Sequence, residues 1–271
     1  MKRILIAFQF LTIIPLEIKG DVAEEEISQS AAFFPVAGVF QGLLAAGSAL
    51  ILINIFPSEI VSGLVILILT VSNGGFHLDG LADTFDALAV KSSGDGAADK
   101  ERRLLVMKDS ANGAIGVVAI VLAILLKFLF MNSLFSGHSV LAAGFFLFVM
   151  PVFSKWVMVP AMYHGVSARK DGLGRIFLDN VNLNTLFIST VSLILFYLAT
   201  ALLLQPGSAG IGSIVQLFFV LFALLYIYNY ASVKFFLRKF GGLTGDSLGA
   251  TSEISEILLL MVASVWLQHY I

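Results

Sequence analysis

The 271-residue sequence contains no cysteine and few charged residues. The absence of cysteine excludes disulfides, thiolate nucleophiles and Cys-based metal sites. Charged residues make up 13 % of the chain and hydrophobic residues 58 %, whereas soluble domains carry roughly 25 % charged residues. The net charge is −2, so the strongly basic balance typical of nucleic-acid-binding proteins is absent as well. This composition predicts an integral membrane protein.

Long apolar segments predict the fold class. A membrane-spanning helix needs about 20 apolar residues, and polar or Gly-rich stretches divide the chain into seven segments of roughly this kind. We expect an all-α, polytopic membrane protein with about seven transmembrane helices, in one domain that covers residues 1–271. The predicted spans are 31–56, 58–72, 112–131, 139–163, 183–204, 211–236 and 254–271.

The first 30 residues predict a different kind of segment. The chain begins Met-Lys-Arg and continues as an apolar run that ends at Pro15. This start resembles a signal sequence, but no A-x-A-like cleavage site follows it. Residues 1–30 are therefore expected to be retained as an N-terminal interfacial segment with an amphipathic helix.

The distribution of lysine and arginine predicts the topology. The loops near Pro57, 133–137 and 205–210 contain neither residue. The loops on the opposite side contain Lys2, Arg3, Lys19, Lys91, Lys100, Arg102, Arg103, Lys108, Arg169, Lys170, Arg175, Lys234, Arg238 and Lys239. By the positive-inside rule, this side faces the cytoplasm, with the N-terminus inside and the C-terminus outside. Lys127 and Lys155 fall inside spans, and Lys127 is expected to extend to a membrane surface.

The most polar stretch next to an apolar segment reads HLDGLADTFD, from His77 to Asp86. In a helix, Asp79, Asp83 and Asp86 stand at i, i+4 and i+7 and share one face. Carboxylates held together repel one another unless a cation lies among them, and Mg²⁺ prefers oxygen ligands. An isolated acidic cluster is more often a solvated helix face. His77 could act as a general base, as a donor to phosphate or only as an interfacial group. Residues 77–111 are the expected main cytoplasmic catalytic loop.

A second motif, MKDSANGAIG, covers residues 107–116 at the start of the span 112–131. Asp109 or Ser110 would cap this helix, and Gly113 allows close approach of a ligand or a neighbouring helix. A helix N-terminus attracts anions such as a diphosphate. Phosphate-binding candidates lie just upstream, namely Arg102, Arg103 and Lys108.

Two further motifs are expected on the same side of the membrane. GGLTGDSLGA, residues 241–250, is a Gly-rich turn before a helix and could bind an anion through its backbone N–H groups. ARKDGLG, residues 168–174, adds Arg169 and Lys170, although alone it reads as an ordinary basic loop. The segment 91–101, rich in Gly, Ser and Ala, is either a plain surface loop or a lid over a substrate.

The four motifs, extended at the first to HLDGLADTFDAL, occur in an order that resembles the cobalamin synthase family. These enzymes are the adenosylcobinamide-GDP ribazoletransferases of bacterial vitamin B12 assembly. FLTIIP (10–15) and FFPVAGVFQG (33–42) resemble the family's opening, so the resemblance covers nearly the whole chain. It implies a Mg²⁺-dependent transfer that joins adenosylcobinamide-GDP to α-ribazole, or to its 5′-phosphate, giving adenosylcobalamin, or its phosphate, and GMP.

The resemblance also implies roles for individual residues. Asp79, Asp83 and Asp109 are the expected metal ligands, Asp86 is a metal ligand or general base, and His77 assists proton transfer. Asp83 also belongs to the expected catalytic group. Candidates for binding phosphate or substrate are Arg102, Arg103, Lys108, Ser110, Gly113, Arg169, Lys170, Thr244 and Asp246.

Localisation and partners follow from the same resemblance. We expect a multi-pass protein of the bacterial cytoplasmic (inner) membrane, in contact with membrane lipid, with its active site on the cytoplasmic face. Corrinoid nucleotide and α-ribazole are the expected substrates, with no nucleic acid. Self-association into a homo-oligomer, and association with other cobalamin-assembly enzymes, would both fit this location in the inner membrane.

Two other functions fit parts of the pattern. A CDP-alcohol phosphotransferase of phospholipid synthesis also gathers aspartates around metal; Asp79 and Gly80 match the opening of its signature, but Asp83 stands where that signature has Ala. A cation-coupled transporter could use the same carboxylates, although transporters place such groups near the membrane midplane. Substrate tests would separate these alternatives.

Overall fold

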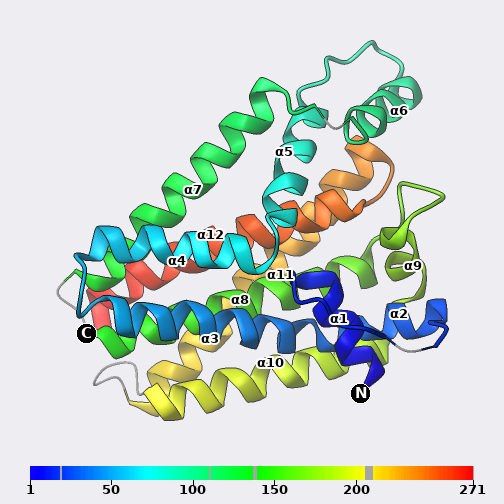
Figure 1. Ribbon diagram of the computed structural model, residues 1–271. Helices are drawn as coiled ribbons and strands as arrows, with labels where there is room; N and C mark the ends of the chain where they lie inside the picture. The colour runs from blue at the N-terminus through cyan, green and yellow to red at the C-terminus, as the bar shows by residue number, and fades with distance from the viewer. Residues whose placement is uncertain (19, 110, 137–138, 205–209, 271) are drawn as a thin grey trace.

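A computed structural model describes residues 1–18, 20–109, 111–136, 139–204 and 210–270. These ranges form helices and connecting turns, with no β-strand among them. The helices are α1 (Lys2–Leu11), α2 (Glu24–Ser30), α3 (Phe34–Leu52), α4 (Ser58–Ser72), α5 (Phe76–Leu88), α6 (Gly96–Val106), α7 (Ala114–Phe135), α8 (Val140–His164), α9 (Leu173–Asn180), α10 (Leu183–Leu204), α11 (Ile211–Phe240) and α12 (Gly245–Tyr270). The predicted all-α class is confirmed (Figure 1).

The described helices are consistent with a multi-pass membrane protein. Six of them are long and apolar enough to cross a membrane, the first running from Glu24 to Leu52 because a short 3₁₀ turn joins α2 to α3. Counting α4 and α5 as one bent crossing gives seven, the predicted number. In Figure 1 the two termini lie at opposite ends of the long helices, which fits an odd number of crossings. The side of the membrane on which each terminus lies stays a prediction.

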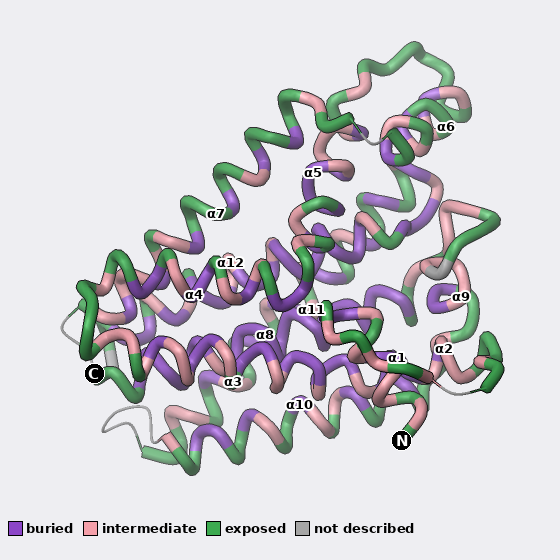
Figure 2. Tube along the Cα trace, in the orientation of Figure 1, coloured by how far each residue is buried: buried purple, intermediate pink, exposed green. Residues whose placement is uncertain are grey.

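Helix α8 forms the centre of the structure. It is apolar over most of its surface, with Lys155 as its one buried charge, and packs against α3, α10, α11 and α12. Figure 2 shows it buried along most of its length, whereas α7 and α10 expose one face each. A helix that is apolar all round must be covered by other elements or by lipid. In α3, Gly38 allows the closest contact with α8, because a Cβ atom there would lie 2.6 Å from the carbonyl oxygen of Pro151.

The break between α4 and α5 positions the first polar motif. The two helices are bent by 88° relative to each other. Gly74 and Gly75 have φ angles of 65° and 73°, a region that side-chain-bearing residues rarely adopt. The side-chain oxygen of Asn73 accepts a hydrogen bond from the Gly75 N–H at 2.9 Å and stabilises the turn. Helix α5 therefore leaves the direction of α4 at the start of the acidic stretch.

The N-terminal segment forms the expected helix. Helix α1 buries Ile6, Ala7 and Leu11 on one face and packs against α2 and α3. Because it is 10 residues long, it is too short to span a bilayer. Its location at the membrane interface stays a prediction.

Close packing of α3 on α8 should be sensitive to a single methyl group. Gly38→Ala should lower the free energy of unfolding by about 1–3 kcal/mol, because the added Cβ overpacks against α8. Gly47→Ala in the same helix is the control, since no atom lies within 4 Å of a Cβ built there. Thermal unfolding in detergent, followed by Trp fluorescence, measures both variants. An equal midpoint for the two would contradict this account of the α3–α8 contact.

Candidate functional site

Close contact between α5 and the start of α12 brings two polar motifs together. A Cβ atom on Gly80 would lie 2.8 Å from the carbonyl oxygen of Asp246 and 2.9 Å from its Cα. Glycine at this position therefore lets the two backbones approach. Asp79 and Asp83, one residue before and three residues after Gly80, are carried to the N-terminal turn of α12.

Acidic side chains and one arginine form the centre of the candidate site. Arg169 donates a hydrogen bond to Asp246 and forms an ion pair with it at 3.1 Å. The charge of Asp83 interacts with the charges of Asp79, Asp86, Asp246 and Arg169. We call Asp79, Asp83, Asp246 and Arg169 the acidic cluster. Three carboxylates compensated by one guanidinium leave an excess of negative charge, which favours a cation among them.

The two Gly-rich loops beside the acidic cluster are joined by backbone hydrogen bonds. Leu243 N–H donates to the carbonyl of Val166 at 2.8 Å, and Ala168 N–H donates to the carbonyl of Leu243 at 2.9 Å. At the start of α12, Thr244 and Ser247 each donate a backbone N–H to the hydroxyl of the other, at 2.8 and 3.1 Å. This reciprocal capping fixes the loop that carries Asp246. These hydrogen bonds join the motifs 168–174 and 241–250, which agrees with the expectation that both lie on the same side of the membrane.

A cavity of about 190 Å³ lies between these loops. Its lining includes Ser167, Arg169, Arg175 and Thr244. The Nε atom of Arg169 is buried and has no hydrogen-bond partner. The cavity lining thus offers two guanidinium groups and Gly-rich backbone, together with the carboxylate of Asp171. Such a set suits the oxygens of a phosphate group.

The carboxylate of Asp86 is hydrogen-bonded to the backbone at the start of α7. Its two carboxylate oxygens accept hydrogen bonds from the N–H groups of Gly113 and Gly116, at 2.7 and 2.8 Å. Both glycines are required by this contact, because a Cβ atom at either position would overlap the Asp86 carboxylate. A carboxylate at a helix N-terminus is stabilised by the free N–H groups and the helix dipole. The anion site predicted at the start of α7, including Gly113, is therefore filled by Asp86.

The predicted caps of that helix are wrong. The N-cap is Gly113, and the side-chain cap comes from Asp86, 27 residues earlier. Asp109 instead accepts a hydrogen bond from the N–H of Ala111 at 3.1 Å, within an exposed loop. Its proposed role as a metal ligand stays a prediction, and Ser110 lies outside the described residues.

The basic residues upstream divide into two groups. Arg103 is buried, and its guanidinium donates to the carbonyl of Lys239 at 3.1 Å, at the end of α11. A cation at a helix C-terminus is favourable, so this residue joins α6 to α11, and its predicted contact with phosphate stays a prediction. Arg102, Lys108 and Lys170 are exposed, and their predicted contacts with phosphate stay predictions.

The segment before α6 is held by hydrogen bonds. Asp99 is buried and accepts bonds from the hydroxyls of Ser92 and Ser93 and from the backbone N–H of Ser93. These donors hold the pKa of Asp99 well below its usual value, at about 2. The bonds are therefore kept at neutral pH. In this structure residues 92 and 93 are a fixed part of the loop, and a lid role for 91–101 stays a prediction.

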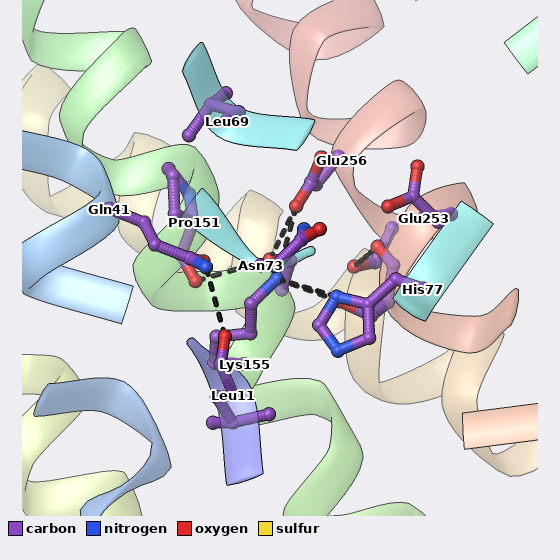
Figure 3. A network of polar contacts seen from close by, with 12 residues as sticks. Leu11, Gln41, Leu69, Asn73, His77, Pro151, Lys155, Glu253 and Glu256 are labelled. Carbon is purple, nitrogen blue, oxygen red and sulfur yellow. Dashed lines mark hydrogen bonds and ion pairs between the residues drawn. The ribbon is translucent and has the colours of Figure 1, made fainter. Parts of the chain in front are cut away.

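His77 lies apart from the acidic cluster, on the face of α5 that packs on α12. It is buried, a Cβ atom on Gly249 would lie 3.2 Å from its Cα, and its Nδ1 lies 3.3 Å from the Lys155 Nζ. Figure 3 shows its ring turned toward Lys155 and the α12 carboxylates. This position does not support the expected role of His77 in proton transfer.

Around His77 lies a buried charge network that sequence reasoning missed. Lys127 forms ion pairs with Glu256 and, at 2.6 Å, with Glu253, and Lys155 pairs with Glu256 at 3.3 Å. Its members Lys127, Lys155, Glu253 and Glu256 come from α7, α8 and α12. The predicted extension of Lys127 to the membrane surface is wrong, because its side chain is buried in this network. Two glutamates three residues apart inside an apolar helix were the available signal.

The described residues do not supply a complete metal site. Among them, no group of three or more His, Asp or Glu side chains lies close enough to hold a metal ion. Mg²⁺, however, binds typically through one or two carboxylates together with water and substrate phosphates. Asp79 and Asp83, beside the cavity with its unpaired arginine donor, fit that arrangement.

Comparison with known proteins identifies the family. The profile of the cobalamin-5-phosphate synthase family matches residues 3–264. The chain belongs to this family. An adenosylcobinamide-GDP ribazoletransferase from Thermodesulfovibrio yellowstonii is 38 % identical over 99 % of this chain and 100 % of its own length. Proteins of the same name from Geotalea daltonii and Fusobacterium nucleatum are 35 % and 32 % identical, over 94 % and 97 % of this chain and 94 % and 96 % of their own lengths. No solved structure matches.

Loss of one charge from the buried network should be far more costly than loss of a surface charge. Lys127→Met leaves Glu253 and Glu256 with too few partners and should lower the free energy of unfolding by about 3–5 kcal/mol. Adding Glu253→Gln should restore part of this loss. Lys2→Met is the control, because Lys2 pairs with Glu26 at a partly exposed position. Chemical unfolding in detergent tests the series, and equal effects for Lys127→Met and Lys2→Met would refute the importance of the network.

Proposed function

We propose that this protein is an adenosylcobinamide-GDP ribazoletransferase that uses Mg²⁺. The observation that carries the proposal is the acidic cluster beside a cavity with an unpaired arginine donor. Transferring a diphosphate-activated corrinoid to a ribose hydroxyl requires neutralising the diphosphate and placing the nucleophile in line. The names of the three relatives supply the substrate class.

The reaction forms one P–O bond and breaks another. A ribose hydroxyl of α-ribazole that is also free in its 5′-phosphate attacks the corrinoid-side phosphorus of the diphosphate, and the bond from that phosphorus to the oxygen retained by GMP breaks. The proton of this hydroxyl passes to a base, and GMP carries away the electron pair of the broken bond. Bound Mg²⁺ would offset the charge on the diphosphate.

The chain's own groups have separate tasks in this step. Arg169 is oriented by Asp246 and directs its unpaired Nε–H to a phosphate oxygen. Asp79 and Asp83 would hold the metal, and one of them accepts the proton of the nucleophile. Asp86 is a weaker candidate for the base, since both of its oxygens already accept backbone hydrogen bonds.

The same proposal includes the setting of the reaction. The acidic cluster and the basic loops would face the cytoplasm at the inner membrane of a bacterium. The support is the distribution of Lys and Arg along the sequence and the helices long enough to span a membrane. Self-association and contact with other cobalamin-assembly enzymes would be compatible with this placement.

The direct test uses purified protein in nanodiscs with adenosylcobinamide-GDP and α-ribazole, with and without Mg²⁺. We expect GMP release and a corrinoid product that carries the ribazole, both lost when EDTA removes the metal. CDP-diacylglycerol with a labelled alcohol, and ion uptake into sealed liposomes, test the two alternative functions. Turnover of CDP-diacylglycerol without any corrinoid product would overturn the proposal.

Asp83→Asn should remove a ligand charge from the acidic cluster. We expect kcat to fall about 100-fold or more, as for loss of other groups that stabilise transition-state charge. The Mg²⁺ concentration for half-maximal activity should rise at the same time. Asp21→Asn, at an exposed position near the N-terminus, is the control. Unchanged turnover and unchanged Mg²⁺ dependence in Asp83→Asn would remove this residue from the metal site.

Arg169→Gln should weaken binding of the diphosphate substrate. We expect the KM for adenosylcobinamide-GDP to rise about tenfold, because a charge-assisted hydrogen bond is lost, while the KM for α-ribazole stays unchanged. Arg3→Gln is the matched control, since this arginine is exposed and lies outside the candidate site. Steady-state rates with each substrate varied in turn separate the two KM values, and an equal rise for both substrates would argue against a phosphate contact.

A further inference from the structure

The cavity between the two Gly-rich loops contains a group that phosphate binding does not explain. We call this cavity, of about 190 Å³, the loop cavity. Its lining combines the guanidinium groups of Arg169 and Arg175 with the carboxylate of Asp171 and the ring of Phe10. A carboxylate repels the phosphates that the two arginines attract. Any ligand contact of Asp171 must therefore be with a different part of the ligand.

The arginines of the loop cavity already have carboxylate partners, and Asp171 has none. Arg169 pairs with Asp246 at 3.1 Å, and Arg175 pairs with Glu24 at 3.4 Å. The side chain of Asp171 forms no hydrogen bond or ion pair with any residue that the structure describes. An ionised carboxylate has two acceptor oxygens. Both oxygens of Asp171 are thus available to donors on a ligand.

The loop that carries Asp171 is held on both sides of this residue. Before it, the hydroxyl of Ser167 donates a hydrogen bond to the carbonyl of Arg169 at 2.7 Å. After it, Gly172 has a φ angle of 90°, and its carbonyl accepts a hydrogen bond from the N–H of Arg175 at 3.2 Å. A group that is already in place loses less conformational entropy when a ligand binds. The loop therefore presents the carboxylate of Asp171 as a fixed acceptor.

The aromatic wall of the loop cavity comes from α1. The ring centroid of Phe10 lies 5.8 Å from that of Phe34 and 4.9 Å from that of Phe177. Packing against these rings holds Phe10 in place beside the cavity. The volume of about 190 Å³ is below the roughly 300–1,000 Å³ of pockets that enclose a whole drug-sized ligand. The loop cavity therefore suits a flat group such as one nucleobase, and not a corrinoid.

Guanine is the base whose hydrogen-bonding groups match Asp171. Its Watson–Crick edge presents two adjacent donors, the N1–H and the 2-amino group, which can bind the two oxygens of one carboxylate. Adenine has an acceptor at N1, so its lone pair would face the carboxylate. The flat faces of a purine also pack well against an aromatic ring. Acceptor, aromatic wall and size thus favour guanine.

We infer that the loop cavity binds the guanine base of the corrinoid substrate, with Asp171 accepting hydrogen bonds from N1–H and the 2-amino group and with Phe10 packed against the base. The inference rests on the proposed function, which supplies a substrate that carries GDP. Arg169 both lines the loop cavity and pairs with Asp246 of the acidic cluster. The diphosphate therefore lies between the base and the acidic cluster, where the metal and the nucleophile meet it.

The test compares two activated corrinoids that differ in one amino group. Adenosylcobinamide-GDP carries guanine, and the corresponding IDP compound carries hypoxanthine, which keeps the N1–H and lacks the 2-amino group. We expect wild-type protein in nanodiscs to prefer the GDP compound about tenfold in kcat/KM, because a site that binds a donor discriminates against the analogue without it. Asp171→Asn should raise the KM for the GDP compound about tenfold and abolish most of this preference. Asp171→Glu should retain the preference.

The direction of the change separates base recognition from a general effect of charge. If Asp171 only lay near the phosphates, loss of its negative charge would lower the KM for the anionic substrate. Asp21→Asn, at an exposed position, is the charge-matched control and should keep the wild-type values, and the KM for α-ribazole should stay the same in all variants. An unchanged or lowered KM for the GDP compound in Asp171→Asn would overturn the inference. So would equal kcat/KM for the GDP and IDP compounds in wild-type protein.

Binding of radiolabelled GMP and IMP distinguishes failure of the inference from failure of the proposed function, since it requires no turnover. If wild-type protein prefers GMP in an Asp171-dependent way but forms no cobalamin product, the base assignment stands and the reaction is wrong. If it forms the product but binds GMP and IMP equally, the reaction stands and the base assignment is wrong. Absence of both would overturn both. The thermal midpoint of Asp171→Asn should equal that of wild type, which confirms that the variant is folded.

Discussion

The constraint on which the structure most depends is the pairing of charge inside apolar helices. Lys127, Lys155, Glu253 and Glu256 are all buried, and none of them could remain ionised there without partners. Their two positive and two negative charges balance only when α7, α8 and α12 lie in one relative register. His77 extends the network to α5. The network therefore fixes the start of the helix that carries the acidic cluster, although it takes no direct part in the proposed chemistry.

Glycine allows the helices to come into close contact where one segment meets the backbone of another. Gly80 admits Asp246, Gly249 admits His77, and Gly113 and Gly116 admit Asp86. In sequence these glycines look like parts of ligand-binding loops. In the structure, several of them lie where another segment of the chain comes close, so their first role is packing. The phosphate-binding role is better assigned to the loops around Arg169 and Thr244, which line an open cavity.

Much of the fold could be predicted because lipid permits few alternatives. A chain crossing a bilayer must satisfy its backbone hydrogen bonds internally, so long apolar runs become helices. The bounds of α4 and α10 agree with the predicted spans, 58–72 and 183–204. The helix containing Glu24 begins before its predicted start, and α12 begins at Gly245 instead of residue 254, since polar residues there are covered by other helices. Hydropathy indicates which part of a helix contacts lipid, and a helix can extend beyond that part.

The candidate site was harder to predict than the fold, because the residues that contact one another there are far apart in the sequence. The pattern of α5 identified Asp79 and Asp83, and the order of motifs identified Arg169 and Asp246, which the structure does bring together. Spacing could not reveal that Asp86 caps a helix 27 residues later. Nor could it show that Arg103 holds a carbonyl 136 residues away. Aspartate and arginine often have purely structural roles. Only the tertiary contacts show whether a given residue is structural or catalytic.

Helix α5 now has a different task on each of its faces. One face holds Asp79 and Asp83 near Arg169, and another holds His77 in the buried network. A short helix turned 88° from its predecessor and fixed at its start by buried charge holds Asp79 and Asp83 where α5 meets the start of α12. The bend at Gly74 and Gly75 is thus the local feature that turns the acidic stretch of α5 out of the direction of α4 and brings it against the start of α12.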